Sequence, residues 1–181
     1  MQIEETPLKD CFLIKPRIFE DHRGIFLETY QRRRFAELSG IDEDFVQDNQ
    51  SVSRYGVLRG MHYQKGEFAQ TKIVRVLYGK VLDVVVDLRP DSPTFKQVHS
   101  VILDDENLNQ LYVPKGFGHG FLTLSEKSVF AYKCDQYYTP GSEAGIIFND
   151  PDLNIDWNFP EREMILSEKD RKLPTFKETF E

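Results

Sequence analysis

The chain contains 181 residues, of which 40% are hydrophobic and 29% are charged, as is ordinary for a soluble globular domain with a substantial core. Its formal net charge of −7 disfavours nucleic acid and anionic membranes as partners. No apolar run approaches the roughly 20 residues that span a bilayer, and the polar N-terminus MQIEETPLKD does not resemble a secretory signal.

Short apolar and β-branched runs, separated by turn residues such as glycine and proline, are typical of β-strands. In chain order they predict strands at 11–19, 24–30, 44–52, 56–64, 70–78, 80–88, 97–103, 109–113, 118–124 and 127–137. Helical patterns occur only in QRRRFAEL (31–38) and DDENLN (104–109). We therefore expect an all-β barrel or sandwich with a few short helices.

The segment after Asp150 is rich in proline and charge, so we expect residues 150–181 to wrap the barrel with short turns. With no linker or repeat in between, residues 1–181 are predicted to form a single domain. Cys11 and Cys134 are too few to indicate a disulfide framework or a zinc motif. They are expected to be reduced core thiols in a cytoplasmic protein.

Three polar residues share strand faces with apolar neighbours. Because successive side chains alternate between the two faces, Lys72 accompanies Val74, Tyr132 accompanies Phe130, and His62 accompanies Leu58. Each could be an isolated polar residue with satisfied hydrogen bonds, or a bulge could rotate it outward. A buried lysine without compensation is costly, so the three together favour a functional cavity.

A metal site is one interpretation of this region. The stretch PKGFGHGF, which contains His119, resembles the second signature of the cupin β-barrels. Metal-binding cupins usually have two histidines two residues apart in the first signature. Here the position two residues after His62 is occupied by Gln64. Glu67 could still join the two histidines, but the nearby cation Lys72 disfavours a divalent metal. We therefore predict no metal.

General acid–base chemistry fits the residue types better. The chain contains no Gly-x-Ser-x-Gly elbow and no Gly-x-x-x-x-Gly-Lys phosphate loop. A histidine can act as a base, a tyrosine as the opposing acid, and a lysine can stabilise an enolate oxygen. The sequence also contains arginines that could bind phosphate or form surface salt bridges: Arg23, Arg59 and Arg75.

Six segments together resemble the dTDP-4-dehydrorhamnose 3,5-epimerase family: DHRGIFLETY (21–30), FVQDNQSVSRYGVLRGMHYQ (45–64), AQTKIVRVLYGKVLDVVVDLR (69–89), VPKGFGHGF (113–121), YKCDQYYTPGSE (132–143) and LSEKD (166–170). The resemblance implies a cupin jelly roll that acts as a homodimer, with its active site near the interface. It also implies epimerisation of dTDP-4-dehydro-6-deoxy-D-glucose at C3 and C5 without metal or cofactor. The product would be dTDP-4-dehydro-β-L-rhamnose, on the way to dTDP-L-rhamnose.

The resemblance also implies catalytic roles at matching positions. His62 matches the base, and Asp170 matches the carboxylate paired with it. Tyr132 matches the acid that returns a proton on the opposite face, and Lys72 matches the group that holds the 4-keto oxygen. Asp83 is a possible counter-ion of Lys72, although its position in the strand also fits a core residue.

Further positions match substrate contacts of the family. Tyr138 matches the aromatic that stacks on the thymine ring. Contacts with the nucleotide, diphosphate or sugar are implied for Arg23, Glu28, Gln47, Asp48, Asn49, Arg59, His119, Glu143 and Lys169. Arg75 receives no role. Two alternatives stay open at this point: an epimerase that inverts only C3 or only C5, and a non-catalytic cupin that binds a nucleotide sugar.

Overall fold

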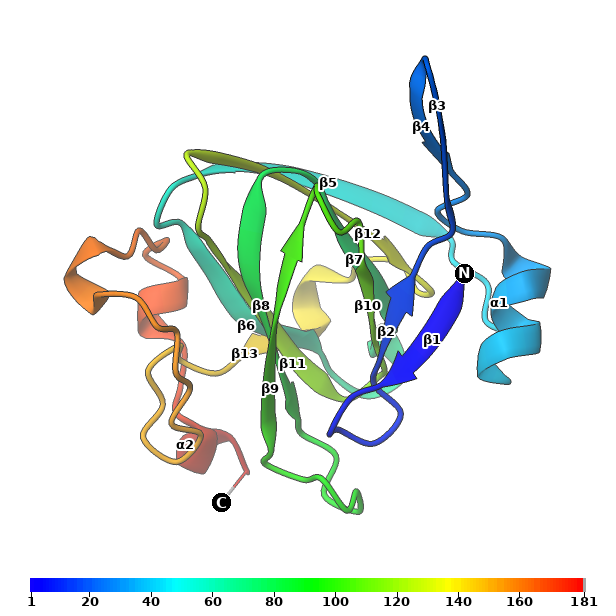
Figure 1. Cartoon of the computed structure of the whole chain (residues 1–181). Helices are drawn as coiled ribbons and strands as arrows, with labels where there is room; N and C mark the ends of the chain where they lie inside the picture. Colours follow the sequence, from blue (N-terminus) through cyan, green and yellow to red (C-terminus); the bar gives the residue numbers. More distant parts are fainter. Residues whose placement is uncertain (181) are drawn as a thin grey trace.

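Two antiparallel sheets pack face to face in the computed structural model, which describes residues 1–180 (Figure 1). The first sheet has the order β1 (Gln2–Glu5), β2 (Phe12–Lys15), β10 (Gln110–Val113), β7 (Lys72–Tyr78), β12 (Lys127–Cys134) and β5 (Gln47–Arg54). The second has the order β13 (Glu143–Gly145), β6 (Leu58–Gln64), β11 (Phe117–Thr123), β8 (Lys80–Asp87) and β9 (Val98–Asp104). This arrangement confirms the predicted all-β class.

The remaining elements are short. Strands β3 (Ile18–Asp21) and β4 (Gly24–Leu27) form a separate hairpin that projects away from the sheets (Figure 1). The α-helices are α1 (Arg32–Ser39) and α2 (Phe176–Phe180), and the 3-10 helices are η1 (Gly66–Phe68), η2 (Pro140–Ser142), η3 (Glu161–Glu163) and η4 (Asp170–Lys172). None of the helices in residues 1–180 has the length and apolar character to cross a membrane.

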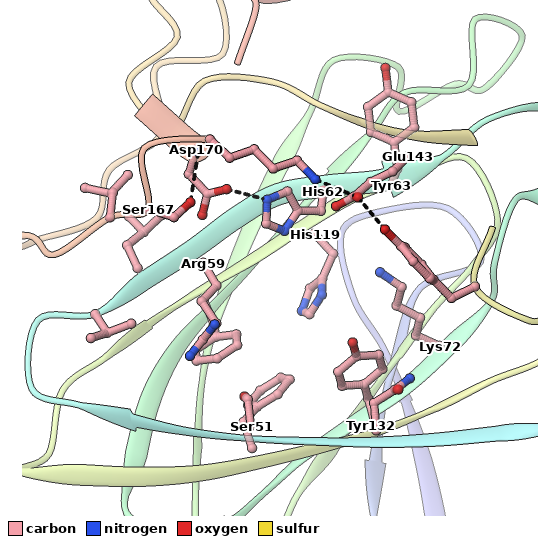
Figure 2. A pocket seen from close by; sticks show the side chains of 18 of the residues that line it. Ser51, Arg59, His62, Tyr63, Lys72, His119, Tyr132, Glu143, Ser167 and Asp170 are labelled. Carbon is pink, nitrogen blue, oxygen red and sulfur yellow. Dashed lines mark hydrogen bonds and ion pairs between the residues drawn. The ribbon is translucent and has the colours of Figure 1, made fainter. Parts of the chain in front are cut away.

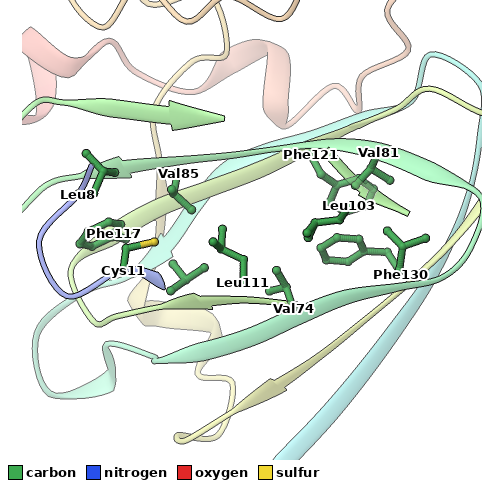
Figure 3. Packing of buried hydrophobic residues seen from close by; sticks show 12 residues of the cluster. Leu8, Cys11, Val74, Val81, Val85, Leu103, Leu111, Phe117, Phe121 and Phe130 are labelled. Carbon is green, nitrogen blue, oxygen red and sulfur yellow. The ribbon is translucent and has the colours of Figure 1, made fainter. Parts of the chain in front are cut away.

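The main core fills the space between the two sheets. Alternate residues of β7 and β12 pack against alternate residues of β8 and β11, as the period of two requires. At the centre, the rings of Phe121 and Phe130 are stacked with their centroids 4.1 Å apart (Figure 3). Val74 and Val85 extend this layer toward Leu111. The inward faces predicted from the sequence are therefore the faces that the core uses.

The C-terminal segment covers the outer face of the second sheet. Trp157 and Phe176 pack there with residues of β6 and β8, which explains why β8 is apolar on both faces. The buried carboxylate of Asp150 holds the segment by accepting backbone N–H bonds from Leu153 at 2.9 Å and Phe176 at 2.6 Å. The segment after Asp150 thus lies along the sheet that carries His62.

Two of the expected elements were wrong. The predicted strand 11–19 breaks at Pro16, which has no N–H to continue a ladder, and becomes the separate strands β2 and β3. The predicted helix 104–109 is a turn in which the Asp104 carboxylate accepts the backbone N–H of Asn107 at 2.8 Å. Such a bond offers the backbone an alternative to a helix.

Candidate active site

A cavity of about 700 Å³ opens between the two sheets and the C-terminal segment (Figure 2). Its walls include Lys72 of β7 and Tyr132 of β12 on one side, and His62 of β6 and His119 of β11 on the other. This size is typical of pockets for small ligands. The three polar residues that the strand pattern placed on inward faces therefore do meet in one cavity.

The strand register explains how these side chains come together. Tyr132 pairs with Val74 across β12 and β7, and the next inward position of β7 is Lys72, whose Nζ lies 5.8 Å from the centroid of the Tyr132 ring. On the opposite sheet His62 pairs directly with His119. Neighbouring strands therefore deliver two adjacent residues to each wall.

A close contact between two strands shapes the histidine wall. Gly60 has φ +135°, and a Cβ there would lie 2.5 Å from the Cα of Gly120. The register of β6 and β11 shifts at this point, between His119 and Phe121. A residue other than glycine would push the strands apart, because neither its backbone angle nor its volume fits.

His62 forms a dyad with Asp170. His62 Nε2 lies 2.8 Å from Asp170 Oδ1, and the Asp170 backbone N–H donates to Ser167 Oγ at 3.0 Å (Figure 2). Burial alone would raise the pKa of Asp170, but its bond to His62 and the positive charge that this ring carries when protonated, with bonds from Ser167 and the Gly60 backbone, hold the pKa below its ordinary value. Because Nε2 faces the carboxylate, Nδ1 is the nitrogen left to accept a proton.

The possible pairing of Asp83 with Lys72 is wrong. The Asp83 carboxylate bonds His119 Nε2 at 2.9 and 3.1 Å instead of pairing with Lys72, and both side chains are buried. Lys72 is half-buried, and its desolvation lowers its pKa, while the charges of Asp83 and Glu143 act in the opposite direction. Asp83 therefore influences Lys72 only through its charge.

Tyr132 and Arg59 lie on opposite sides of the cavity (Figure 2). Burial raises the pKa of Tyr132, although the charge of Arg59 opposes this, so the phenol stays protonated at neutral pH. Arg59 Nε donates to Ser53 Oγ at 3.1 Å. The cavity thus offers a protonated phenol on one side and a guanidinium on the other.

A polar cluster joins Tyr138, Glu143 and Lys169 in the cavity wall. The Tyr138 hydroxyl donates to Glu143 Oε2 at 2.8 Å, and Lys169 Nζ lies 2.6 Å from the same oxygen. Burial would raise the pKa of Glu143, but these two bonds lower it. Gln47 Oε1 accepts the backbone N–H of Tyr138 at 3.0 Å, and Asn49 also lines the cavity.

Four predicted contact residues are not among those that line the cavity of their own chain. One of them, Gln47, lies behind Tyr138 and bonds its backbone. Arg23 is in the β3–β4 hairpin, where it pairs with Asp21. Glu28 follows this hairpin and lies 3.7 Å from Arg34. Asp48 points to the other face of β5 and bonds Lys133 Nζ at 2.9 Å. The hairpin residues therefore do not line the cavity of their own chain.

Some residues that line the cavity were not predicted from the sequence. Ser51 shares a face of β5 with Asn49, and its buried hydroxyl has no hydrogen-bond partner in residues 1–180. Alternation along β5 was the signal that could have identified it. Ser167 and Tyr63 line the cavity as well. In the described part of the chain, no three histidine, cysteine or acidic side chains gather closely enough to hold a metal ion.

Comparison with known proteins supplies the chemical context. Residues 5–178 match the family model described as dTDP-4-dehydrorhamnose 3,5-epimerase. The chain is 47% identical over 174 residues to the enzyme of that name from Salmonella typhimurium, covering 96% of this chain and 94% of the relative.

Solved structures agree with this match. The crystal structure of dTDP-4-dehydrorhamnose 3,5-epimerase from Elizabethkingia anophelis has a TM-score of 0.95 at 55% identity, covering 98% of this chain and 97% of that one. A dTDP-6-deoxy-D-glucose-3,5-epimerase from Legionella pneumophila, solved in complex with dTDP-4-keto-L-rhamnose, has a TM-score of 0.93 at 48% identity, with 97% and 93% covered.

Proposed function

Because the chain belongs to the dTDP-4-dehydrorhamnose 3,5-epimerase family, we propose that the cavity around His62 is its active site. The protein is an isomerase that inverts C3 and C5 of dTDP-4-dehydro-6-deoxy-D-glucose and yields dTDP-4-dehydro-β-L-rhamnose in dTDP-L-rhamnose biosynthesis. The observation that carries the site is the His62–Asp170 dyad, which lies across one cavity from Lys72 and Tyr132. Epimerisation leaves the oxidation level unchanged, so the reaction needs no redox cofactor.

The first half of the reaction removes a proton. The 4-keto group makes the hydrogens at C3 and C5 acidic, and His62 Nδ1 takes one of them. Asp170 keeps the ring oriented and stabilises the imidazolium that forms. The electrons of the broken C–H bond move into an enolate whose oxygen lies against Lys72 Nζ, where a fixed cation stabilises the developing charge.

The second half returns a proton from the opposite side. Tyr132 and His62 come from different sheets and lie on opposite walls of the cavity (Figure 2). Tyr132 donates its phenolic proton to the enolate carbon, which inverts that centre, and both groups then exchange protons with solvent. The same pair acts at C3 and at C5. Arg59 binds the diphosphate, so that remote binding energy orients the sugar ring.

Incubation with dTDP-4-dehydro-6-deoxy-D-glucose in heavy water tests this function. We expect one deuterium at C3 and one at C5, and NMR couplings that show both centres inverted. Inversion of one centre alone would identify a single-position epimerase. Tight binding of the sugar nucleotide without any exchange would identify a non-catalytic binding protein instead.

We also propose that the enzyme is a homodimer whose hairpins reach the partner's cavity. The β3–β4 hairpin exposes Phe19 and Phe26, which are 47% and 69% accessible, and such apolar surface is typical of an interface. The same hairpin carries Arg23, which lies outside the cavity of its own chain. A partner would bury the aromatic rings and place Arg23 beside the diphosphate.

Complementation between two impaired variants tests this arrangement. Arg23→Ala should lower kcat/KM, and His62→Ala should abolish turnover. When the two chains are co-expressed and pair at random, about half of the dimers are mixed, and one of the two sites in each mixed dimer is intact. We therefore expect about a quarter of wild-type activity. As a control, His62→Ala with Lys72→Ala should recover nothing, because both residues line the same cavity. A mixture of Arg23→Ala and His62→Ala without recovered activity, or a monomer in light scattering, would contradict the exchange of hairpins.

The cysteines agree with the expected cytoplasmic location, which we propose on this basis. Cys11 and Cys134 are both buried and unpaired. Burial raises the pKa of Cys11 to about 12 and that of Cys134 to about 11, so both stay protonated and unreactive. Thiols of this kind suit a reducing compartment.

A further inference from the structure

We propose that Gln64 is the residue that positions Tyr138 for stacking on the nucleotide base. This inference rests on the function proposed above, in which Tyr138 contacts thymine. Gln64 ends β6 two residues after His62 and is only 5% exposed. It occupies the place where a metal-binding barrel would have its second histidine, and its contacts explain why an amide stands there.

All four hydrogen-bonding positions of the Gln64 amide are used. Nε2 donates to the carbonyls of Phe68 at 3.0 Å and Tyr137 at 3.4 Å, while Oε1 accepts the Thr139 N–H at 2.7 Å and the Ser142 hydroxyl at 3.0 Å. Two of these partners are the backbone groups immediately before and after Tyr138. A single side chain therefore holds the backbone on both sides of the stacking residue.

Neither a histidine nor a glutamate can make this set of bonds. A neutral histidine has one donor and one acceptor, so it could replace at most two of the four bonds. A glutamate has only acceptors when ionised and would face the Phe68 and Tyr137 carbonyls with negative charge. Glutamine has two donors and two acceptors at the right ends of one planar group. Gln64 thus serves the geometry of a loop, and not the coordination of a metal.

The position of Tyr138 depends strongly on these bonds. The residue is 50% exposed, so packing alone holds its side chain weakly. Outside the Gln64 amide, the Tyr138 backbone N–H donates to Gln47, and its hydroxyl donates to Glu143. Glu143 itself pairs with the backbone of Gln64 in the β13–β6 ladder. Loss of the amide would free the backbone around Tyr138, while the strand that carries Lys72 stays in place.

Binding of dTDP, which lacks the reacting sugar, isolates this effect from catalysis. By calorimetry on the full-length protein, we expect Gln64→Leu and Tyr138→Ala each to raise the Kd of dTDP about tenfold, the range of one base–aromatic stack. The double variant should bind no more weakly than Tyr138→Ala, because the two residues act through one contact. In turnover assays, the loss in Gln64→Leu should fall on KM rather than on kcat.

A matched control separates position from stability. Gln110 is also buried, and its Nε2 donates to the Thr29 carbonyl at 2.8 Å, but it lies outside the cavity. Gln110→Leu should lower the melting temperature and leave the Kd of dTDP unchanged. Should Gln64→Leu fail to fold, Ser142→Ala removes one of the four partners and should raise the Kd about two- to threefold.

Several results would overturn the inference. Wild-type Kd in Gln64→Leu together with weakened binding in Tyr138→Ala would reject the role of Gln64 and leave the stacking role intact. Additive losses in the double variant would likewise show that Gln64 does not act through Tyr138. Wild-type Kd in Tyr138→Ala would reject the stacking role itself and with it the role of Gln64.

Discussion

Replacement of His62 by alanine should slow deuterium incorporation at both C3 and C5 of the 4-keto sugar about a thousandfold, within the range of general base catalysis. His62 is the only side chain to which we assign proton removal at either carbon. Its Nε2 is committed to Asp170 at 2.8 Å, which leaves Nδ1 as the base. Exchange is measured by mass spectrometry and NMR in heavy water, under conditions in which the binding of dTDP is shown to persist.

Two further variants make the His62 experiment specific. Asp170→Asn keeps a polar partner for the ring but removes the charge that stabilises the imidazolium, so its loss should be smaller than that of His62→Ala. His99 is a half-buried histidine on β9, outside the cavity, and His99→Ala should exchange at the wild-type rate. If His62→Ala exchanged deuterium at the wild-type rate, His62 would not be the base.

Replacement of Tyr132 by phenylalanine should separate proton removal from inversion. The variant keeps His62, Asp170 and Lys72, so enolate formation should continue. Without the phenolic proton on the opposite wall, protons return from the His62 side, and the starting configuration is restored. We therefore expect deuterium in recovered substrate, while formation of the inverted product falls about a hundred- to a thousandfold. NMR of substrate and product in heavy water measures both quantities together.

The appropriate control for Tyr132→Phe is the loss of another buried phenol. Tyr112 is buried outside the cavity, and its hydroxyl donates to Glu43 Oε2 at 3.1 Å. Tyr112→Phe should cost stability because Glu43 loses a partner, but it should leave exchange and inversion unchanged. If Tyr132→Phe lost exchange and inversion equally, Tyr132 would be needed for proton removal, and the assignment of two opposed groups would be wrong.

The faces of the central strands could be predicted from the sequence. Because side chains alternate with a period of two, Lys72 and Val74 must share one face, as must Tyr132 and Phe130. The structure places all four on the interior side, and it confirms the all-β class and the helix near residues 31–38. Strand periodicity is local, so it needs no knowledge of which strands are neighbours.

Partners distant in the chain could not be derived in this way. Asp170 lies 108 residues beyond His62, and the two meet only because the C-terminal segment folds back over the second sheet. Resemblance to a family suggested this pair, whereas periodicity did not. The same holds for Asp83. Its strand position was compatible with a counter-ion of Lys72 and with a core residue, whereas the register of β8 and β11 places it beside His119.

Strand alternation in the sequence predicts which residues face inward, and the motifs identify the family and hence the reaction. The folded structure shows the bonding partners of each polar side chain, which alternation along a strand does not predict. It shows that Gln64 anchors the loop around Tyr138, that Asp83 belongs to His119, and that Arg23 lies outside its own cavity. The physical reason is that hydrogen bonds require particular atoms within about 3 Å, and strand register, bulges and loop closure set these positions jointly across the whole chain.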